Sequence, residues 1–343
     1  MILSIIIVSY NTKELLEQCL ESITASIGRN KLQITSSKKQ TSSKSQVPNQ
    51  RLSLSDLEII IVDNNSADGT QEYLKQLTIK SPKLKVKNSK KETSPKLQIP
   101  NLKIILNKDN AGFAKANNQG VREAEGEYIL FLNPDTIVYP KTLEETAGYL
   151  SFHPDTGLVT CRIELPDGSL QKECHRGFPT PWRALCHFSG LGQLFPKSKL
   201  FAGYFLGHLP KNTIHEIDAC VGAFMMTKKE IGDQIGWWDE DFFWYGEDLD
   251  FGYRTKRAGF KVIFYPKVKI THYQGASSGI KKTKSRANKE TKRKVMIASV
   301  EAMRIFYQKH YQDKYPKAIS LLVMGGIALL EKIRLWSVER QFK

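Results

Sequence analysis

The 343-residue sequence lacks the motifs of several common protein classes. No G-x-G-x-x-G follows the first predicted strand and no G-x-x-x-x-G-K-[ST] occurs, so the usual dinucleotide fingerprint and the P-loop are both absent. The five cysteines form no C-x-x-C pair and match no standard zinc spacing, which predicts buried thiols in a reducing compartment. The apolar run at residues 319–330 is shorter than the roughly 20 residues that a helix needs to cross a bilayer.

The positive charge of the chain is concentrated in three segments. The net charge is +16, but residues 29–56, 75–103 and 281–294 hold 23 basic and three acidic residues, and the rest holds 28 basic and 32 acidic residues. The first two segments have little to bury, so we expect inserted basic loops at about 28–56 and 78–101. The basic segments also lack the interleaved aromatics of a stacking platform. The charge therefore indicates no specific nucleic-acid partner.

Short apolar segments alternate with helical patterns along the first half of the chain. We expect strands at residues 2–10, 57–62, 102–106 and 128–132, with helices after Asn11 and at 71–77, 114–124 and 142–152. The first apolar run has neither a basic flank nor a small-residue cleavage site, so we expect a strand there and not a signal peptide. This order predicts right-handed crossovers and an α/β, Rossmann-like, mostly parallel sheet flanked by helices.

Beyond residue 152 the pattern is less regular. We expect strands at residues 158–165, 217–227, 262–265 and 268–271, and helices at 249–258 and 298–307. Residues 171–209 show weak periodicity, and we interpret them as a variable excursion that faces the substrate.

Polar clusters follow three of the predicted strands. They are Tyr10-Asn11, Asp63 to Ser66, and Asn133 to Asp135. Pro134 cannot donate to a sheet ladder, so the strand before it ends there and leaves Asp135 at its carboxyl end. One such cluster is ordinary turn chemistry, but three at the carboxyl edge of a parallel sheet predict a binding cleft. A nucleotide there would be held by side chains and by the helix starts at Asn11 and Asn110.

The densest chemical stretch is residues 236–250, where six carboxylates lie among six aromatic residues. Glu247 and Asp248 precede a predicted helix, whose dipole favours acidic residues at that end. Carboxylates enclosed by aromatic rings are also partly desolvated, which raises their basicity toward that of a general base. The stretch alone leaves both interpretations open. His272 follows the last predicted strand as either a ligand or an ordinary strand-end histidine.

Seven motifs occur in a fixed order between residues 8 and 272. They are V-S-Y-N at 8–11, V-D-N-N-S-x-D-G-T at 62–70, N-x-G-F-x-x-x-N-N-x-G at 110–120, F-L-N-P-D at 131–135, G-A-F at 222–224, D-E-D-F-F-x-Y-G-E-D-x-D at 239–250, and His272. In this order the sequence resembles the family 2 glycosyltransferases with the GT-A fold, and the rhamnosyltransferase-like subgroup looks closest. The resemblance covers about residues 2–272, interrupted by the two basic inserts.

The resemblance implies a role for each matching residue. The base and ribose would be held by Tyr10, Asn11, Asp63 and Ser66, with Asp63 accepting from the pyrimidine edge. The nucleotide-sugar cleft would be lined by Asn110, Gly112, Phe113 and Asn117. The divalent cation, Mg²⁺ or Mn²⁺, would be bound by Asp135 and His272. The catalytic base would be Asp248, and the acceptor side would be shaped by Trp238, Asp239 and Glu247.

Asn133 is a departure from the D-x-D pattern of the family, since it stands where the first aspartate would be. An asparagine can still orient a ribose or a metal-bound water. The loss of one carboxylate nevertheless weakens the expected cation site.

The function that the resemblance implies is inverting transfer of a rhamnose-like sugar from a nucleoside-diphosphate donor to a hydroxyl of a cell-surface polysaccharide or a lipid-linked acceptor. Two alternatives stay open. One is the same cleft with UDP-N-acetylglucosamine or UDP-galactofuranose as donor, and the other is a catalytically silent protein that only binds a nucleotide sugar.

The carboxyl-terminal part is expected to be separate from the catalytic domain. We divide the chain into a GT-A domain at residues 1–280 and a basic linker with a helical tail at 281–343. The apolar run at 319–330 lies between basic residues and would either pack on the core or lie in a membrane interface. The second alternative places the enzyme in the cytoplasm, peripheral at the inner face of the cytoplasmic membrane.

Overall fold

A computed structural model describes residues 3–28, 52–79, 99–274 and 289–341. Most of the two predicted basic inserts, and residues 281–288 of the third basic segment, lie outside these residues. The strands of the described part join in one sheet. Their bounds are β1 (Leu3–Ser9), β2 (Leu57–Asp63), β3 (Leu102–Leu106), β4 (Tyr128–Leu132), β5 (Thr136–Val138), β6 (Thr156–Glu164), β7 (His215–Ile217), β8 (Phe224–Lys228) and β9 (Lys261–His272).

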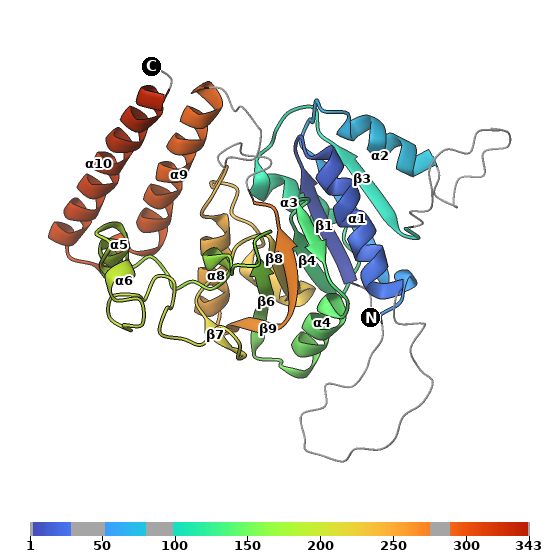
Figure 1. Cartoon of the computed structure of the whole chain (residues 1–343), viewed down its shortest axis with the longest axis horizontal. Helices are drawn as coiled ribbons and strands as arrows, with labels where there is room; N and C mark the ends of the chain where they lie inside the picture. Colours follow the sequence, from blue (N-terminus) through green and yellow to red (C-terminus); the bar gives the residue numbers. More distant parts are fainter. Residues whose placement is uncertain (1–2, 29–51, 80–98, 275–288, 342–343) are drawn as a thin grey trace, which may run out of the picture.

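Helices flank this sheet and extend beyond it at one end (Figure 1). Their bounds are α1 (Lys13–Gly28), α2 (Thr70–Ile79), α3 (Phe113–Glu123), α4 (Thr142–Phe152), α5 (Pro181–Phe188), α6 (Leu191–Leu194), α7 (Lys229–Ile235), α8 (Glu247–Arg257), α9 (Lys289–His310) and α10 (Lys317–Gln341). The predicted helix at 142–152 is confirmed to the residue, and the α/β class is confirmed.

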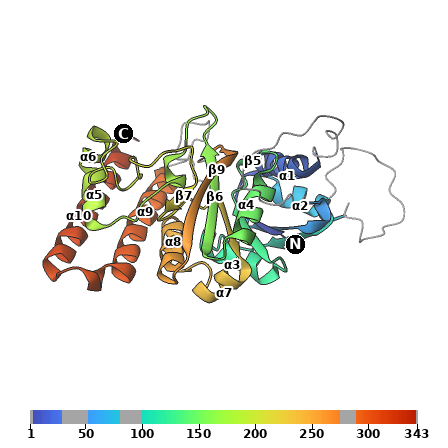
Figure 2. The same cartoon turned by 90° about the horizontal axis from the view of Figure 1, so that it is seen from below.

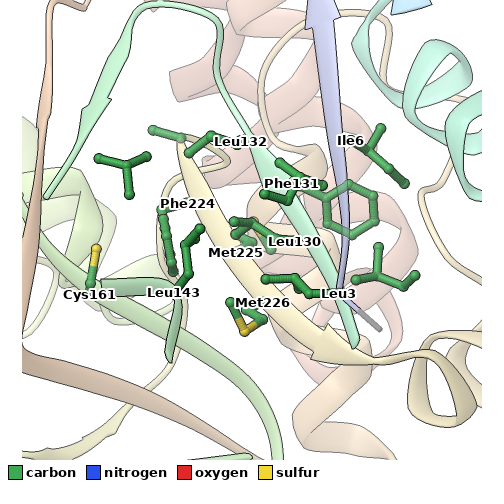
Figure 3. Close-up of a cluster of buried hydrophobic side chains, with 14 of the residues drawn as sticks. Leu3, Ile6, Leu130, Phe131, Leu132, Leu143, Cys161, Phe224, Met225 and Met226 are labelled. Atoms are coloured by element: carbon green, nitrogen blue, oxygen red, sulfur yellow. The ribbon is translucent and has the colours of Figure 1, made fainter. Parts of the chain in front are cut away.

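The amino-terminal half of the sheet is parallel, in the order β3-β2-β1-β4. Every residue of β1, β2 and β4 is buried, which explains why these strands are almost entirely apolar. Figure 3 shows Leu3 and Ile6 of β1 lying close to Leu130 and Phe131 of β4. Each fully buried side chain of this size contributes about 1.5–3 kcal/mol, so this central layer fixes the register of the strands that lead to the cleft.

The carboxyl-terminal half of the sheet is mixed. Strand β8 runs antiparallel to β4 and to β6, whereas β6 and β9 are parallel. The strand predicted at 217–227 is wrong, because β7 ends at Ile217, β8 begins at Phe224, and a loop lies between them. The two predicted strands at 262–265 and 268–271 form one strand, β9, whose register against β6 shifts after Tyr265. Pro266 has no N–H to donate, which accounts for the irregularity at that point.

Helices α9 and α10 lie side by side at the end of the molecule opposite α2 (Figures 1 and 2). Phe306 and Tyr307 of α9 belong to a second apolar cluster that also contains Phe242 and Tyr253, so α9 packs directly on the α8 region. His310 Nε2 lies 2.7 Å from the buried Asp250 carboxylate and adds a polar connection. Within the described residues, no helix combines the length and the hydropathy that crossing a membrane requires.

Candidate active site

A cavity of about 620 Å³ opens at the carboxyl edge of the sheet. Asp135, just after β4, and Asp248, in the first turn of α8, both line it although 113 positions separate them in the chain. Both carboxylates are buried, with less than a tenth of either residue exposed. The fold thus brings the two predicted carboxylates to one pocket of a size that binds small molecules in proteins.

Asp135 belongs to a compact polar group on one wall of the cavity. Its Oδ1 lies 3.1 Å from Nε2 of His272, at the end of β9, and Asn133 Nδ2 lies 3.3 Å from the same nitrogen. His272 Nδ1 lies 2.7 Å from Oε1 of Gln171, an acceptor, so Nδ1 is the donor in this contact. His272 Nε2 and the Asp135 carboxylate oxygen, 3.1 Å apart, are close enough for both to coordinate one cation when Nε2 carries no proton.

The donor set on this wall is small for a protein metal site. Within the described ranges, no group of three or more His, Cys, Asp and Glu residues is arranged to hold a metal ion. Two side chains could coordinate a metal ion directly, the Asp135 carboxylate and the His272 imidazole, and the Asn133 amide lies beside them. Such a set fits Mg²⁺ or Mn²⁺ only when the substrate supplies the remaining oxygen ligands, as phosphates commonly do.

The Asp248 side chain is held by an arginine on the opposite wall. Arg176 Nη2 lies 2.7 Å from Asp248 Oδ2 and 3.0 Å from the carbonyl oxygen of Cys220. Asp248 Oδ1 accepts from the backbone N–H of Leu249 at 2.7 Å. Burial alone would lower the pKa of Arg176, but the adjacent Asp248 carboxylate more than offsets this and the pKa is raised. The pair therefore keeps a negative carboxylate inside the cavity.

Glu247 lies beside Asp248 in a different protonation environment. Burial, together with the negative charge of Asp248, raises the pKa of Glu247 to about 8. Its Oε2 is buried without a hydrogen-bond partner among the described residues. At neutral pH Glu247 is therefore mostly protonated, and the carboxyl group can donate a hydrogen bond into the cavity that Asp248 shares.

The ends of β1 and β2 are joined by a network of backbone and side-chain hydrogen bonds. The Asn11 N–H donates to Ser66 Oγ at 2.8 Å, and Asn11 itself has a positive φ of 53°. Asp63 is fully buried, and its Oδ1 accepts from the Ser66 N–H and from Gln71 Nε2, both at 3.0 Å. Asp63 Oδ2 is buried without a hydrogen-bond partner in the described part of the chain, and none of these four residues lines the cavity in this structure. Tyr10 next to them is half-buried.

The segment that opens α3 brings Phe113 to the cavity wall. Gly112 precedes it with a φ of +84°, and a side chain there would approach Phe243 at 2.9 Å, so this position requires glycine. Asn110 Oδ1 accepts from the Gly112 N–H at 3.0 Å. The side chain of Asn117 donates to the Phe113 carbonyl at 2.9 Å and is almost fully buried. Asn110 and Asn117 therefore support the loop in this structure and do not line the cavity.

Two residues predicted to shape the acceptor side do not lie on the cavity wall. Trp238 is 2% exposed and packs edge-on against Phe131 with ring centroids 4.7 Å apart, so it belongs to the core. Asp239 lies 2.5 Å from Lys309 Nζ of α9 and so connects the acidic stretch to that helix. In this structure apolar packing and an ion pair use these two side chains, and a role at the acceptor side stays a prediction for both residues.

Sequence reasoning missed three residues of the cavity wall. Arg176 and Gln171 lie in the excursion whose weak periodicity carried no interpretation, and only the fold brings them to Asp248 and His272. Trp244 occupies the unassigned position of the D-E-D-F-F-x-Y motif and lines the cavity. The carboxylates around Trp244 in the sequence could have indicated its place at the cavity, whereas no local pattern marks Arg176 or Gln171.

Comparison with known proteins places this geometry in a family. A family model described as "Glycosyl transferase family 2" matches residues 4–231, which is about two thirds of the chain. The chain belongs to glycosyltransferase family 2. The matched region of this glycosyltransferase contains Asp63, Asp135 and Arg176, and it ends before Asp248 and His272.

Curated relatives of this glycosyltransferase include rhamnosyltransferases. It is 23% identical over 232 residues to the N-acetylglucosaminyl-diphospho-decaprenol L-rhamnosyltransferase of Mycobacterium tuberculosis, covering 64% of this chain and 68% of the relative. It is 27% identical over 176 residues to the rhamnosyltransferase WbbL of Escherichia coli K12, covering 47% of this chain and 61% of that protein. These likenesses support the rhamnosyltransferase-like subgroup.

A solved structure supports the fold of this glycosyltransferase. The mannosyltransferase PcManGT from Pyrobaculum calidifontis, in complex with GDP-Man and Mn²⁺, superposes with a TM-score of 0.52 at 16% identity. The likeness covers 98% of this chain and 73% of that one. At this level of identity it supports the predicted GT-A fold and nothing finer about the substrate.

Proposed function

We propose that this glycosyltransferase moves a rhamnose-like sugar from a nucleoside-diphosphate donor to a hydroxyl of a lipid-linked or polysaccharide acceptor, with inversion at the anomeric carbon. The observation that carries the proposal is the shared cavity of Asp135 and Asp248, with His272 beside the first and Arg176 beside the second. The rhamnose-like sugar is inferred from the names of the two relatives.

Asp248 is the general base in this proposal. Arg176 Nη2 and the Leu249 N–H use only part of the hydrogen-bonding capacity of its carboxylate, which leaves lone pairs for an acceptor hydroxyl. As the hydroxyl oxygen attacks the anomeric carbon, its proton passes to Asp248 and the bond from that carbon to the diphosphate oxygen breaks. A single displacement of this kind inverts the configuration of the anomeric carbon.

Asp135, His272 and Asn133 are the residues that would hold a divalent cation. When bound, Mg²⁺ or Mn²⁺ would neutralise the charge that develops on the departing diphosphate. Asp63, through its unpartnered Oδ2, is the proposed acceptor for the base, with Tyr10, Asn11 and Ser66 next to it. Phe113 and Gly112 are proposed to support the sugar, because the Phe113 ring lies on the cavity wall. Asn110 and Asn117 hold this loop in place.

The proposed location is the inner face of the cytoplasmic membrane. Helix α10 uses Val323, Ile327 and Val338 for packing, and it leaves other apolar side chains exposed. The most exposed of them are Leu321, Leu322, Leu329, Ile333 and Trp336. An exposed apolar stripe that includes a tryptophan and is flanked by Lys317 and Lys332 fits an interfacial helix. We therefore propose that one face of α10 packs on the protein and that the opposite face contacts the membrane.

A direct transfer assay tests the function. The full chain is incubated with Mn²⁺, a panel of nucleoside-diphosphate sugars and a diphosphate-linked sugar acceptor, and the products are analysed by mass spectrometry and by the NMR coupling of the new anomeric proton. We expect transfer from a nucleoside-diphosphate rhamnose with inverted configuration. Transfer only from UDP-N-acetylglucosamine or UDP-galactofuranose would refute the sugar, and binding of donors without any transfer would identify a silent binding protein.

Flotation tests the location separately. Vesicles of phosphatidylcholine with a quarter of phosphatidylglycerol are expected to carry the full chain to the top of a density gradient at low salt. Protein that remains at the bottom would contradict the proposed membrane contact and would leave the transfer proposal intact.

A further inference from the structure

The cavity that contains Asp248 extends into an apolar compartment between three helices. Helix α5 contributes Ala184 and Phe188 to its wall, and helices α9 and α10 contribute several more apolar residues. In both views of the molecule α5 lies next to the α9–α10 pair (Figures 1 and 2). The compartment and the catalytic carboxylate are therefore parts of one continuous space, and a molecule seated in the first can reach the second.

The spacing of the wall residues shows that each helix presents one face to this space. On α9 the residues are Ser299, Ala302, Met303, Phe306 and Tyr307, which recur on one side of the helix. On α10 they are Val323, Ile327 and Arg334, which also recur on one side of a helix. Apart from Ser299, Tyr307 and Arg334 on these two helices and His187 on α5, the wall residues that the three helices contribute are apolar, which favours a hydrocarbon chain over a polar sugar.

Arg334 is the exception with a full charge. It is half-buried, and its Nη1 donates to Ser299 Oγ at 2.7 Å. Burial lowers the pKa of the Arg334 guanidinium, because water stabilises its charge less than at the surface. Within the described residues no carboxylate pairs with it, whereas Arg304 on the neighbouring helix pairs with Glu301 and Glu331. The guanidinium of Arg334 thus retains donors for an anion from outside the protein.

We propose that this compartment binds the acceptor of the reaction as an amphiphile, with its hydrocarbon chain between α5, α9 and α10 and its phosphate on Arg334. The proposal rests on the transferase function above and specifies its acceptor as a lipid phosphate. The arginine fork matches a phosphate group in two parallel hydrogen bonds, which a lone lysine cannot do. An anion on Arg334 also lies in the same cavity as the Asp248 carboxylate, so the hydroxyl and the phosphate of one acceptor have separate partners.

A binding experiment without donor tests this assignment independently of catalysis. The full chain is titrated in a calorimeter with farnesyl diphosphate below its micelle concentration, with farnesol, and with inorganic diphosphate. We expect farnesyl diphosphate to bind at least about tenfold more tightly than either fragment, since it alone uses both the apolar wall and Arg334. Equal affinity for inorganic diphosphate and farnesyl diphosphate would overturn the hydrocarbon part of the assignment.

Two variants with matched controls locate the site. Arg334→Gln is expected to weaken farnesyl diphosphate binding about tenfold, while Lys332→Gln, which removes the same charge from an exposed position on α10, changes it less than about twofold. Met303→Trp narrows the compartment and is expected to weaken farnesol binding, with Leu321→Trp on the exposed face as its control. Circular dichroism verifies the fold of each variant.

The same variants separate this site from that of the donor, which also carries phosphates. Nucleoside-diphosphate affinity in Mn²⁺ is expected to be unchanged by Arg334→Gln. A loss of nucleotide affinity in that variant, or an equal effect of Arg334→Gln and Lys332→Gln on farnesyl diphosphate, would refute the acceptor assignment. Lipid-phosphate binding without transfer from any donor would retain the site and reject the transferase function instead.

Discussion

Arg176 and Asp248 form a buried ion pair, with Nη2 and Oδ2 2.7 Å apart and about a tenth of either side chain exposed. The two residues come from segments 72 positions apart, the loop before α5 and the first turn of α8. The pair orients the carboxylate of the proposed base. Its disruption therefore affects stability and catalysis in ways that can be measured separately.

Arg176→Gln is expected to destabilise the protein by about 3–5 kcal/mol, since it leaves a buried carboxylate without its cation. The value of kcat/KM should fall as well, because the carboxylate of the proposed base loses the group that orients it. Denaturant unfolding and kcat/KM measure the two effects. The double variant Arg176→Gln/Asp248→Asn is the control and should recover stability without recovering activity. An unchanged kcat/KM of the folded Arg176→Gln protein would contradict the orienting role.

Asp248→Asn is expected to lower kcat by a factor of about 10²–10⁴, the usual contribution of a general base, while nucleoside-diphosphate affinity stays nearly intact. Initial rates and calorimetric titration of the nucleotide measure the two quantities. Asp241→Asn is the matched control, because Asp241 lies in the same acidic stretch but is exposed and pairs with Lys309. If nucleotide affinity falls together with the rate in Asp248→Asn, Asp248 is a donor-binding residue and not the base.

Asn133→Asp restores the carboxylate that the D-x-D pattern of the family would have, and it places that group beside His272. We expect tighter Mn²⁺ binding in the presence of nucleoside diphosphate, since a second carboxylate adds a preferred oxygen ligand. Asp135→Asn should do the reverse and abolish the Mn²⁺-dependent rise in melting temperature. A thermal-shift series with and without Mn²⁺ reads out both variants. A cation effect that persists in Asp135→Asn would exclude this wall of the cavity as the metal site.

Glu247→Gln tests the raised pKa of about 8. In the folded state the wild-type carboxyl keeps its proton between its unfolded pKa, near 4.3, and about pH 8, so folding takes up a proton in this window and stability falls as pH rises through it. A glutamine at this position does not ionise, so it adds no pH dependence to the free energy of unfolding. The free energy of unfolding of Glu247→Gln relative to wild type should therefore increase from pH 5 to pH 8, by up to about 1.4 kcal/mol per pH unit. A difference that does not vary with pH would show that Glu247 is ionised when folded.

The sequence predicted those parts of the molecule that local chemistry determines. The unbroken apolar runs of β1 and β2 leave no alternative to buried strands, and Pro134 ends β4 just before Asp135. The helix at Thr142–Phe152 follows from its own periodicity. The location of Asp135 and Asp248 in one cavity required more than local chemistry, and here the order of the motifs was decisive.

Features that depend on packing between distant segments were not predictable. Trp238 and Trp244 both lie in the aromatic and acidic stretch at 236–250, but Trp238 is buried against Phe131 and Trp244 lines the cavity. The segment at 217–227 is apolar enough for a strand, yet it is interrupted where the backbone of residues 218 and 219 bonds to Arg176. The tertiary structure decides whether such a side chain lies in the core or at the cavity, and whether such a segment forms a strand or a loop, because the local sequence is compatible with both.

The attachment of α9 to the region around α8 has a consequence for the way the chain can be divided. A cut at residue 280 would remove Phe306 and Tyr307 from the cluster around Phe242, and it would leave Asp250 without its histidine. Helices α9 and α10 therefore cannot be replaced by a membrane anchor from another protein. The helix pair forms part of the wall of the proposed catalytic cavity, and its removal would expose that cavity to water.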